Sequence, residues 1–174
     1  TIATAMAHPL ISGFLRKVVT SEIAPHVTSV PGMDALTYLD LVERRFANPE
    51  IKDTTRRVAF DGSSRHPGFL LPSIRDALGK GHPVAGLALA EALWARYCAG
   101  TREDGSVVEP NDPIWDSLHA TALRARKEPS VWLGMRDIYG DVLQQGEFAD
   151  AFCAALRELY DDGVEVTLQR YLDK

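Results

Sequence analysis

Residues 83–100, PVAGLALAEALWARYCAG, form the stretch on which the fold of this chain depends. Pro83 suits the first turn of a helix, where its missing N–H would be unpaired anyway, and Gly100 suits the end of one. The apolar residues between them are Val84, Leu87, Ala88, Leu89, Leu93, Trp94 and Tyr97. A helix with so little polar surface is normally buried. The stretch therefore predicts a central helix with the other elements packed around it.

Amphipathic patterns on both sides of this stretch predict further helices. They cover residues 9–23, 34–47, 49–60, 69–78, 112–123, 132–139, 147–161 and 164–172. Helix starts are indicated by Asp34, by Asn48 before Pro49 and by Asp112 before Pro113. Residues 61–64 read as a turn and 101–111 as an exposed polar connection. Because alternating strand patterns and internal repeats are nearly absent, we expect one all-α domain of about eight to ten helices.

The composition excludes several classes of protein. The chain has 174 residues, 45% hydrophobic and 25% charged, with a net charge of -5 and a pI near 5.5. This length suits one domain, and an acidic balance argues against nucleic-acid binding, which needs cations to neutralise phosphates. No apolar run approaches the roughly 20 residues that cross a bilayer. We expect neither nucleic acid nor membrane as a partner.

The ends and the cysteines indicate the context of the chain. Residues 1–7, TIATAMA, already read as helix, without an initiator Met or a basic leader. We expect the chain to be part of a longer polypeptide. Cys98 and Cys153 lie in apolar helical patterns, which predicts buried thiols rather than a disulfide and suits a reducing cytoplasm.

Motifs for metal or nucleotide binding are not found. Gly79-Lys80-Gly81 lacks a preceding strand and reads as a helix connection rather than a dinucleotide loop. The histidines never share a helix with a carboxylate at ligand spacing. They are His8, His26, His66, His82 and His119. We expect no metal site.

Residues 56–78, RRVAFDGSSRHPGFLLPSIRDAL, are the best candidate for a binding site. The stretch gathers cations around the expected turn: Arg56, Arg57, Arg65, His66 and Arg75. Guanidinium groups beside one turn can hold a carboxylate or several hydroxyls by paired hydrogen bonds. The alternative is a solvated surface network in which they pair with nearby carboxylates. Those carboxylates are Asp53, Asp61 and Asp76.

Several segments in this region resemble the mannitol dehydrogenase family. They are Tyr38-Leu39 with ERRFANP at 43–49, RRVAFDGSS at 56–64 and FLLPSIRD at 69–76. The family comprises long-chain polyol dehydrogenases and hexuronate reductases, of mannitol/fructose or mannonate/fructuronate type. The resemblance is concentrated in residues 38–78 and extends over the chain as the C-terminal helical domain of the family.

The resemblance implies roles for particular residues. The family arginine that contacts substrate matches Arg57, and the basic residue after the Ser-Ser pair, usually Lys, matches Arg65. Arg56 and His66 are possible accessory residues. The change from Lys to Arg keeps the charge but replaces a compact donor with a planar fork, which leaves the polyol or sugar acid open.

The resemblance also implies an upstream Rossmann domain that binds NAD or NADP, followed by a helix bearing Lys as the general base with Asn and His. This spacing, with Asn five and His eight residues after Lys, is found at none of four lysines: Lys17, Lys52, Lys80 and Lys127. Residues 1–174 would then be the substrate-binding domain of a metal-independent oxidoreductase acting on a sugar alcohol or hexuronate. Alone, the chain is expected to be inactive.

Two further expectations concern partners. If the upstream domain packs here, apolar side chains should be exposed near residues 1–20 and around Arg57. The competing hypothesis is a non-enzymatic helical module whose exposed face recruits another protein.

Overall fold

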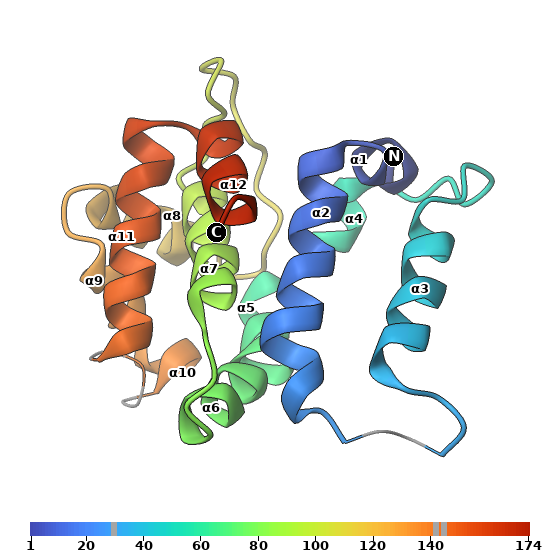
Figure 1. Cartoon of the computed structure of the whole chain (residues 1–174). Helices are drawn as coiled ribbons and strands as arrows, with labels where there is room; N and C mark the ends of the chain where they lie inside the picture. The colour runs from blue at the N-terminus through green and yellow to red at the C-terminus, as the bar shows by residue number, and fades with distance from the viewer. Residues whose placement is uncertain (29–30, 141–142, 144–145) are drawn as a thin grey trace.

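Helix α7 (Ala85–Cys98) is the central helix of the computed structural model, which describes residues 1–28, 31–140, 143 and 146–174. Leu87, Ala88 and Cys98 are fully buried in it. Helix α11 (Glu147–Asp161) packs along α7, and Figure 1 shows the two side by side. The prediction of a central buried helix in residues 83–100 is confirmed, because its apolar side chains meet neighbours on every side.

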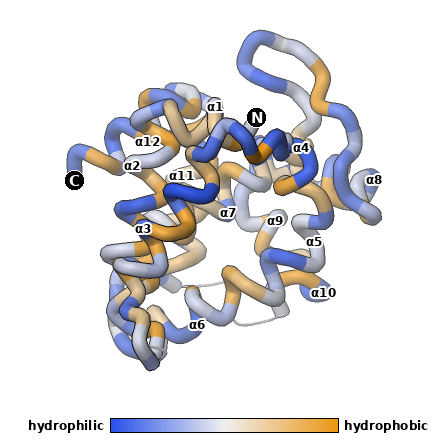
Figure 2. The backbone as a smooth tube through the Cα atoms, turned by 90° about the vertical axis from the view of Figure 1, so that its right-hand side faces the viewer, coloured by the Kyte–Doolittle hydropathy of each residue, from blue (hydrophilic) through white to orange (hydrophobic). Residues whose placement is uncertain are grey.

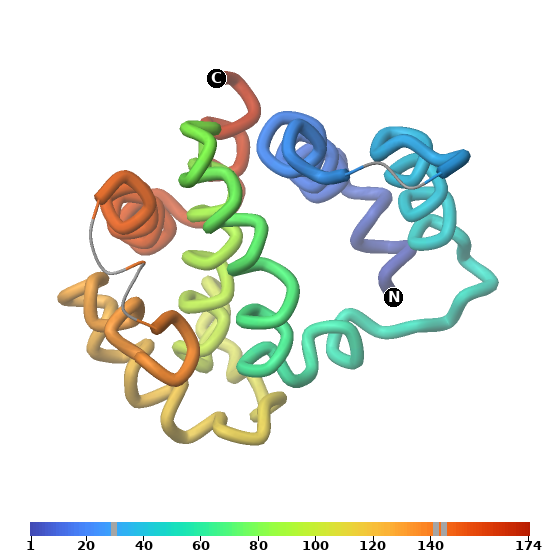
Figure 3. Tube along the Cα trace, turned by 90° about the horizontal axis from the view of Figure 1, so that it is seen from below, coloured from blue at the N-terminus to red at the C-terminus, as the bar shows by residue number. Residues whose placement is uncertain are grey.

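The other helices lie around α7, and those of the N-terminal part extend together to one side of it (Figures 1 and 3). They are α1 (Ile2–Met6), α2 (Pro9–Val18), α3 (Ala35–Phe46), α4 (Thr55–Val58), α5 (Gly62–Arg65), α6 (Leu71–Gly79), α8 (Trp115–Ala125), α9 (Ser130–Leu133), α10 (Arg136–Tyr139) and α12 (Val164–Leu172). Val19–Ile23 and His66–Leu70 are π-helical, and Ala24–His26 is a 3₁₀ turn. The described residues contain no strand, so the all-α prediction is confirmed. None of their helices combines the length and apolar character needed to cross a bilayer.

Helix α3 stands at the edge of the molecule, away from the α7–α11 pair (Figure 1). Asp34 caps it as predicted, accepting hydrogen bonds from the backbone N–H groups of Leu36 and Thr37. Arg16 of α2 connects the two helices through ion pairs with two α3 carboxylates, Asp40 at 2.9 Å and Glu43 at 2.5 Å. These surface ion pairs add to the burial of Leu39, which is 3% exposed and is the one buried residue of α3.

The start of α7 is capped by a carboxylate that is distant in sequence. Glu22, 2% exposed, accepts hydrogen bonds from Gly86 N at 2.7 Å and Leu87 N at 2.9 Å. Its Oε1 also accepts a 2.9 Å bond from the hydroxyl of Tyr171 in α12. An anion at a helix N-terminus satisfies free N–H groups and opposes the helix dipole. Glu22 thus joins the π-helical end of α2 to α7 and α12.

The helix predicted over residues 49–60 is mostly absent. Asn48 Oδ1 accepts a 3.0 Å hydrogen bond from Glu50 N, which closes a turn where a helix start was expected. Such local side-chain bonds compete with helix formation. The helix in this region is the four-residue α4, capped by Thr54, whose hydroxyl accepts from Arg57 N at 3.1 Å. The prediction was right only for the last part of the segment.

The turn predicted at residues 61–64 is also wrong. Asp61 alone is left-handed, with φ of 63°, and Gly62 begins helix α5. Asp is among the residues that adopt this conformation at low cost. Helix α5 continues through the π-helical His66–Leu70 into α6, so residues 62–79 form one nearly continuous helical segment.

Two smaller expectations also need correction. Helix α8 begins at Trp115 rather than at Asp112, and of the apolar residues in the predicted segment 112–123 Leu118 is buried while Ile114 is 45% and Leu123 51% exposed. The segment 132–139 is divided between α9 and α10.

The cysteine prediction is confirmed for Cys98, which is fully buried, whereas Cys153 is partly buried; both are free thiols. Burial raises the pKa of both thiols.

Candidate functional site

Residues 53–70, here called the arginine segment, hold the predicted site residues. The chain crosses from the end of α3 toward α5 (Figure 3). Helix α4 carries Arg56 and Arg57, and α5 ends at Arg65. His66 begins the π-helix that follows.

Arg57 is anchored by its side chain to Asp53. The Nε and Nη2 groups of Arg57 donate to the two carboxylate oxygens of Asp53 in a bidentate pair. The Arg57 side chain is still 70% exposed, against 15% for Asp53. The hydrogen bond raises the pKa of Arg57 and lowers that of Asp53. The surface-network alternative named Asp53 as a partner of the arginines, and this ion pair is present. The pair nevertheless leaves the other N–H groups of the Arg57 guanidinium unused.

Arg56 points toward a different neighbour. Its Nη1 and Nη2 donate to the backbone carbonyls of Glu109 at 3.2 Å and Pro110 at 2.7 Å. In return, Asn111 Nδ2 donates to the Arg56 carbonyl at 2.8 Å. Arg56 therefore connects α4 to the loop that follows α7.

That connection was predicted to be exposed, which is wrong for its last residues. Figure 2 shows a largely hydrophilic loop projecting from the body, yet Val108 and Asn111 are each 6% exposed. Beyond them, Asp112 accepts hydrogen bonds from Ser63 N at 2.8 Å and Ser63 Oγ at 2.7 Å. Residues 108–112 thus form a support for both α4 and α5. The available sequence signal was the apolar Val108, four residues before the potential capping residue Asp112.

Arg65 is exposed, and its side chain makes no hydrogen bond or ion pair with the described residues. Large apolar side chains around it and Arg57 are exposed as well: Ile51 43%, Val58 37%, Phe60 48% and Phe69 79%. In residues 1–20, Ile11 at 40% is the one large apolar residue in this category. The expected apolar surface is therefore present around the arginine segment and largely absent from the first helices.

His66 belongs to a buried polar network. Its Nδ1 lies 2.7 Å from Oε1 of Glu91, which is 0% exposed in the middle of α7. Glu91 Oε2 accepts a 2.7 Å bond from the Tyr139 hydroxyl, which accepts a 2.6 Å bond from Trp132 Nε1. Burial, and then the charge of Glu91, raise the pKa of Tyr139. The sequence analysis missed Glu91, although a lone carboxylate in LALAEALW is a recognisable signal.

Aromatic packing fixes the same segment from another side. The His66 ring stacks on Trp94, with centroids 4.0 Å apart and planes at 17°. Gly62 lies against Trp94 so closely that a Cβ there would stand 2.6 Å from the indole Nε1. Real Cβ atoms do not approach another group so closely. Gly62 and His66 together fix α5 and the start of the π-helix against α7.

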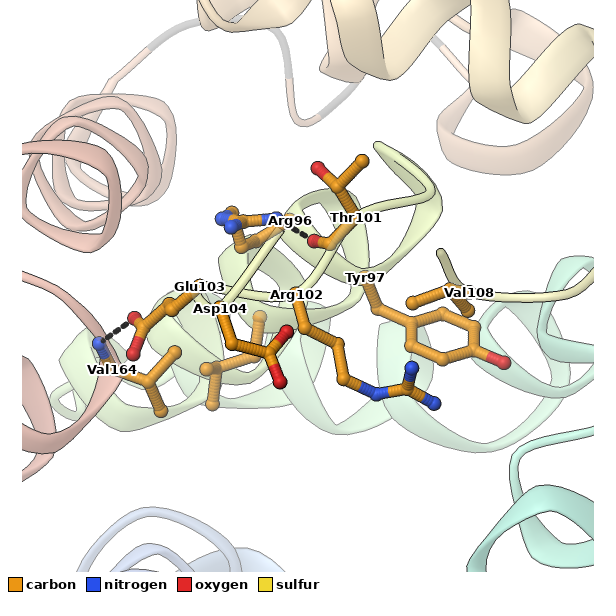
Figure 4. Close-up of a pocket in the computed structure, with 9 residues that line it drawn as sticks. Arg96, Tyr97, Thr101, Arg102, Glu103, Asp104, Val108 and Val164 are labelled. Atoms are coloured by element: carbon orange, nitrogen blue, oxygen red, sulfur yellow. Dashed lines mark hydrogen bonds between the residues drawn. The ribbon is translucent and has the colours of Figure 1, made fainter. Parts of the chain in front are cut away.

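A separate pocket of about 480 Å³ lies at the far end of α7 (Figure 4). There Arg96 Nη1 donates to the Thr101 carbonyl at 2.6 Å, and Glu103 Oε1 accepts from Val164 N at 2.6 Å. These contacts close the loop onto the start of α12, and none of the predicted site residues lines the pocket. Among the described residues, no group of His, Cys, Asp and Glu side chains is arranged to hold a metal ion.

Comparison with known proteins assigns the class. The family profile described as mannitol dehydrogenase C-terminal domain matches residues 1–160. The chain belongs to this family, which confirms the resemblance found in residues 38–78 and the helical fold that it implied.

Individual relatives agree with the family. The chain is 52% identical over 171 residues to mannitol 2-dehydrogenase of Cereibacter sphaeroides, covering 98% of this chain and 36% of that protein. It is similar to a solved structure of Pseudomonas fluorescens mannitol 2-dehydrogenase, a ternary complex with NAD and D-mannitol, with a TM-score of 0.93, 30% identity and coverage of 99% and 35%. A substrate-free D-sorbitol dehydrogenase shares the fold, with a TM-score of 0.84 at 21% identity over 96% of this chain and 34% of that one. The chain thus spans about a third of the length of these relatives.

Proposed function

We propose that residues 1–174 are the substrate-binding domain of an NAD-dependent oxidoreductase that interconverts a sugar alcohol and a ketose, of the mannitol type. The observation that carries this proposal is the match of nearly the whole chain to mannitol 2-dehydrogenases, at 52% identity in one case. The relatives named above favour mannitol over the mannonate type, which the sequence had left open. Membership of an oxidoreductase family also favours this function over a protein-recruiting module.

We propose the same division of labour that the resemblance implied. Since the chain spans about a third of its relatives, an upstream Rossmann domain would bind NAD and supply the lysine general base. In such a protein the bound NAD accepts or delivers the hydride. The described residues of the present domain contain helices and no strand, and Gly79 ends α6 rather than forming a dinucleotide loop, which is consistent with this division.

In this proposal Arg57 and Arg65 orient the polyol. The Asp53 pair holds the Arg57 guanidinium by two N–H groups and leaves others to donate to substrate hydroxyls. Arg65, without an internal partner among the described residues, supplies a second fork on the same segment. The exposed Val58, Phe60 and Phe69 would pack against the upstream domain and exclude water from the arginines.

Steady-state kinetics of Arg57→Ala and Arg65→Ala in the full-length polypeptide test the proposal. Each variant should lower kcat/KM for mannitol on the order of 10- to 100-fold, because each loses a charged hydrogen-bond donor. The loss should be larger for a substrate with a carboxylate, which binds a guanidinium more strongly than a hydroxyl does. The pH profile should keep its shape, since the proton chemistry belongs to another residue.

Arg45→Ala is the matched control. Arg45 is an exposed arginine in the last turn of α3, outside the arginine segment, and its removal should leave the kinetics unchanged. If both site variants stay within twofold of wild type on every accepted substrate, the surface-network alternative is correct for these arginines.

A further inference from the structure

Glu91 is a buried carboxylate for which the proposed function so far gives no use. It lies in the middle of the most apolar helix, is 0% exposed, and is held by Tyr139 and His66 rather than by Lys or Arg. Burying an acidic group inside a helix core is costly unless its hydrogen bonds are satisfied. A shape-matched apolar residue would serve the packing as well, so the carboxylate needs another explanation.

The direction of the hydrogen bonds in this network is set by Trp132. An indole N–H can only donate, and Trp132 Nε1 donates to the Tyr139 oxygen. The Tyr139 proton is therefore free to point at Glu91 Oε2, which accepts it. Oε1 of the same carboxylate accepts as well, so the His66 Nδ1 that faces it must carry the proton. The carboxylate thus selects the His66 tautomer in which Nε2 carries the lone pair.

His66 Nε2 faces away from this network. The His66 side chain is 22% exposed, and Nε2 is neither bonded to a described residue nor among the buried polar atoms without a partner. Stacking on Trp94 prevents the ring from turning freely. The accessible nitrogen follows directly after Arg65 in the chain, so it belongs to the same surface segment.

This nitrogen has a property that the arginines lack. Guanidinium groups only donate hydrogen bonds, whereas each hydroxyl of a polyol has a proton to donate as well as lone pairs. The guanidinium groups of Arg57 and Arg65 themselves offer no acceptor for that proton. An imidazole nitrogen that carries a lone pair and is held in one orientation supplies one.

We propose that Glu91 is a positioning residue that fixes His66, and that His66 Nε2 accepts a hydrogen bond from a hydroxyl of the polyol held by Arg57 and Arg65. The inference rests on the proposed function for the identity of the ligand. The tautomer of His66 does not depend on that function and can be measured separately.

Two variants of the full-length polypeptide separate the outward nitrogen from the buried contact. In His66→Asn the side-chain amide can still donate to Glu91 from the place of Nδ1, but Nε2 is gone. In Glu91→Gln the amide can donate to Nδ1, which transfers the histidine proton to Nε2 and turns the acceptor into a donor. Glu22→Gln is the matched control, because it places the same amide at another buried carboxylate, which caps the start of α7 from the π-helix Val19–Ile23 and lies outside the arginine segment.

Both test variants should raise KM for mannitol about 10-fold, the usual cost of a substrate hydrogen bond, with a smaller change in kcat and a cooperative thermal transition. Glu22→Gln should leave KM unchanged. An unchanged KM in His66→Asn would overturn the substrate contact. If Glu91→Gln does not fold, the His66→Asn result still decides this point.

Nitrogen-15 NMR of labelled histidine in the full-length polypeptide tests the positioning role. It reports which ring nitrogen of His66 carries the proton, and a purely structural role of Glu91 would not change that nitrogen. Wild type should show His66 protonated at Nδ1, and Glu91→Gln should show it protonated at Nε2. A wild-type proton on Nε2 would overturn the role of Glu91 whether or not the protein oxidises polyols. If the wild-type NMR result is as expected but no polyol is a substrate, the proposed function fails and the His66–Glu91 geometry stands.

Discussion

The two arginines of the candidate site are held in contrasting ways. Arg57 is fixed by its own side chain, through Asp53, on a four-residue helix whose main anchors are loop carbonyls. The side chain of Arg65 has no partner among the described residues, but its backbone is fixed to the core by Gly62 and His66. The position of Arg57 therefore depends on a surface charge pair, and that of Arg65 depends on buried packing.

This difference predicts how the two halves of the site respond to substitution. Changes beneath Arg65 should affect folding and binding together, because the same buried groups serve both. Changes beside Arg57 should affect binding with little effect on folding, since an exposed ion pair adds little stability.

Glu91→Ala should have the largest effect and should destabilise the part of the site that carries Arg65. It removes the partner of both His66 and Tyr139 and leaves a cavity in α7. Leaving the donors of His66 and Tyr139 without their acceptor costs about 1–3 kcal/mol each. Urea denaturation should show this loss in the free energy of unfolding. A loss below about 1 kcal/mol would mean that the network is not a buried anchor.

Gly62→Ala should have the next largest effect. The new Cβ would stand 2.6 Å from the Trp94 indole, and Trp94 is itself packed against Trp132. Overpacking of this kind costs about 1–3 kcal/mol. Binding of mannitol should weaken as well, because α5 must shift and Arg65 ends it.

Gly68→Ala is the control for that variant. Gly68 lies in the same helical segment, has nothing within 4 Å of an added Cβ and does not have a positive φ. Its stability should stay within about 0.5 kcal/mol of wild type. Equal losses of stability in the two glycine variants would show that the loss comes from replacing glycine in this helical segment and not from the contact with Trp94.

Long, strongly patterned elements could be predicted from the sequence. The apolar run of α7 and the stripe of α11 each require burial on the faces that the structure buries, and Asp34 signals a cap that needs no distant partner. The family segments likewise pointed to the stretch that carries Arg57 and Arg65. These signals are local, so one sequence suffices to read them.

The remainder depends on partners far apart in the chain. Helix α5 exists where a turn was expected because Asp112, 49 residues beyond Ser63, accepts from its backbone. Asn48 closed a turn of its own instead of capping a helix. Glu91 stands out in the sequence as a carboxylate in an apolar helix, but only the folded chain shows that it faces His66.

Asp53→Asn should have the smallest effect on folding. It tests whether the Asp53 ion pair orients Arg57 for substrate binding. The amide cannot form the bidentate charged pair, so Arg57 loses its preferred direction while keeping its charge. Thermal unfolding should be nearly unchanged, because Arg57 is largely exposed. The kcat/KM for mannitol in the full-length polypeptide should fall about 3- to 10-fold, less than for Arg57→Ala, because the guanidinium can still reach the substrate without being held in place.

The pH dependence of that loss follows from the Asp53 pKa, which the Arg57 hydrogen bond lowers. A carboxyl whose folded pKa is depressed contributes fully above its unfolded pKa, about 3.9, and loses its contribution only as pH falls through the lower folded value. The ratio of wild-type to Asp53→Asn kcat/KM should therefore be constant between about pH 5 and pH 9. Glu50→Gln, which neutralises an exposed carboxylate near the same segment, should give a ratio near one throughout. A ratio for Asp53→Asn that changes near neutral pH would mean that another titrating group holds Arg57, and that the two arginines differ less than their contacts indicate.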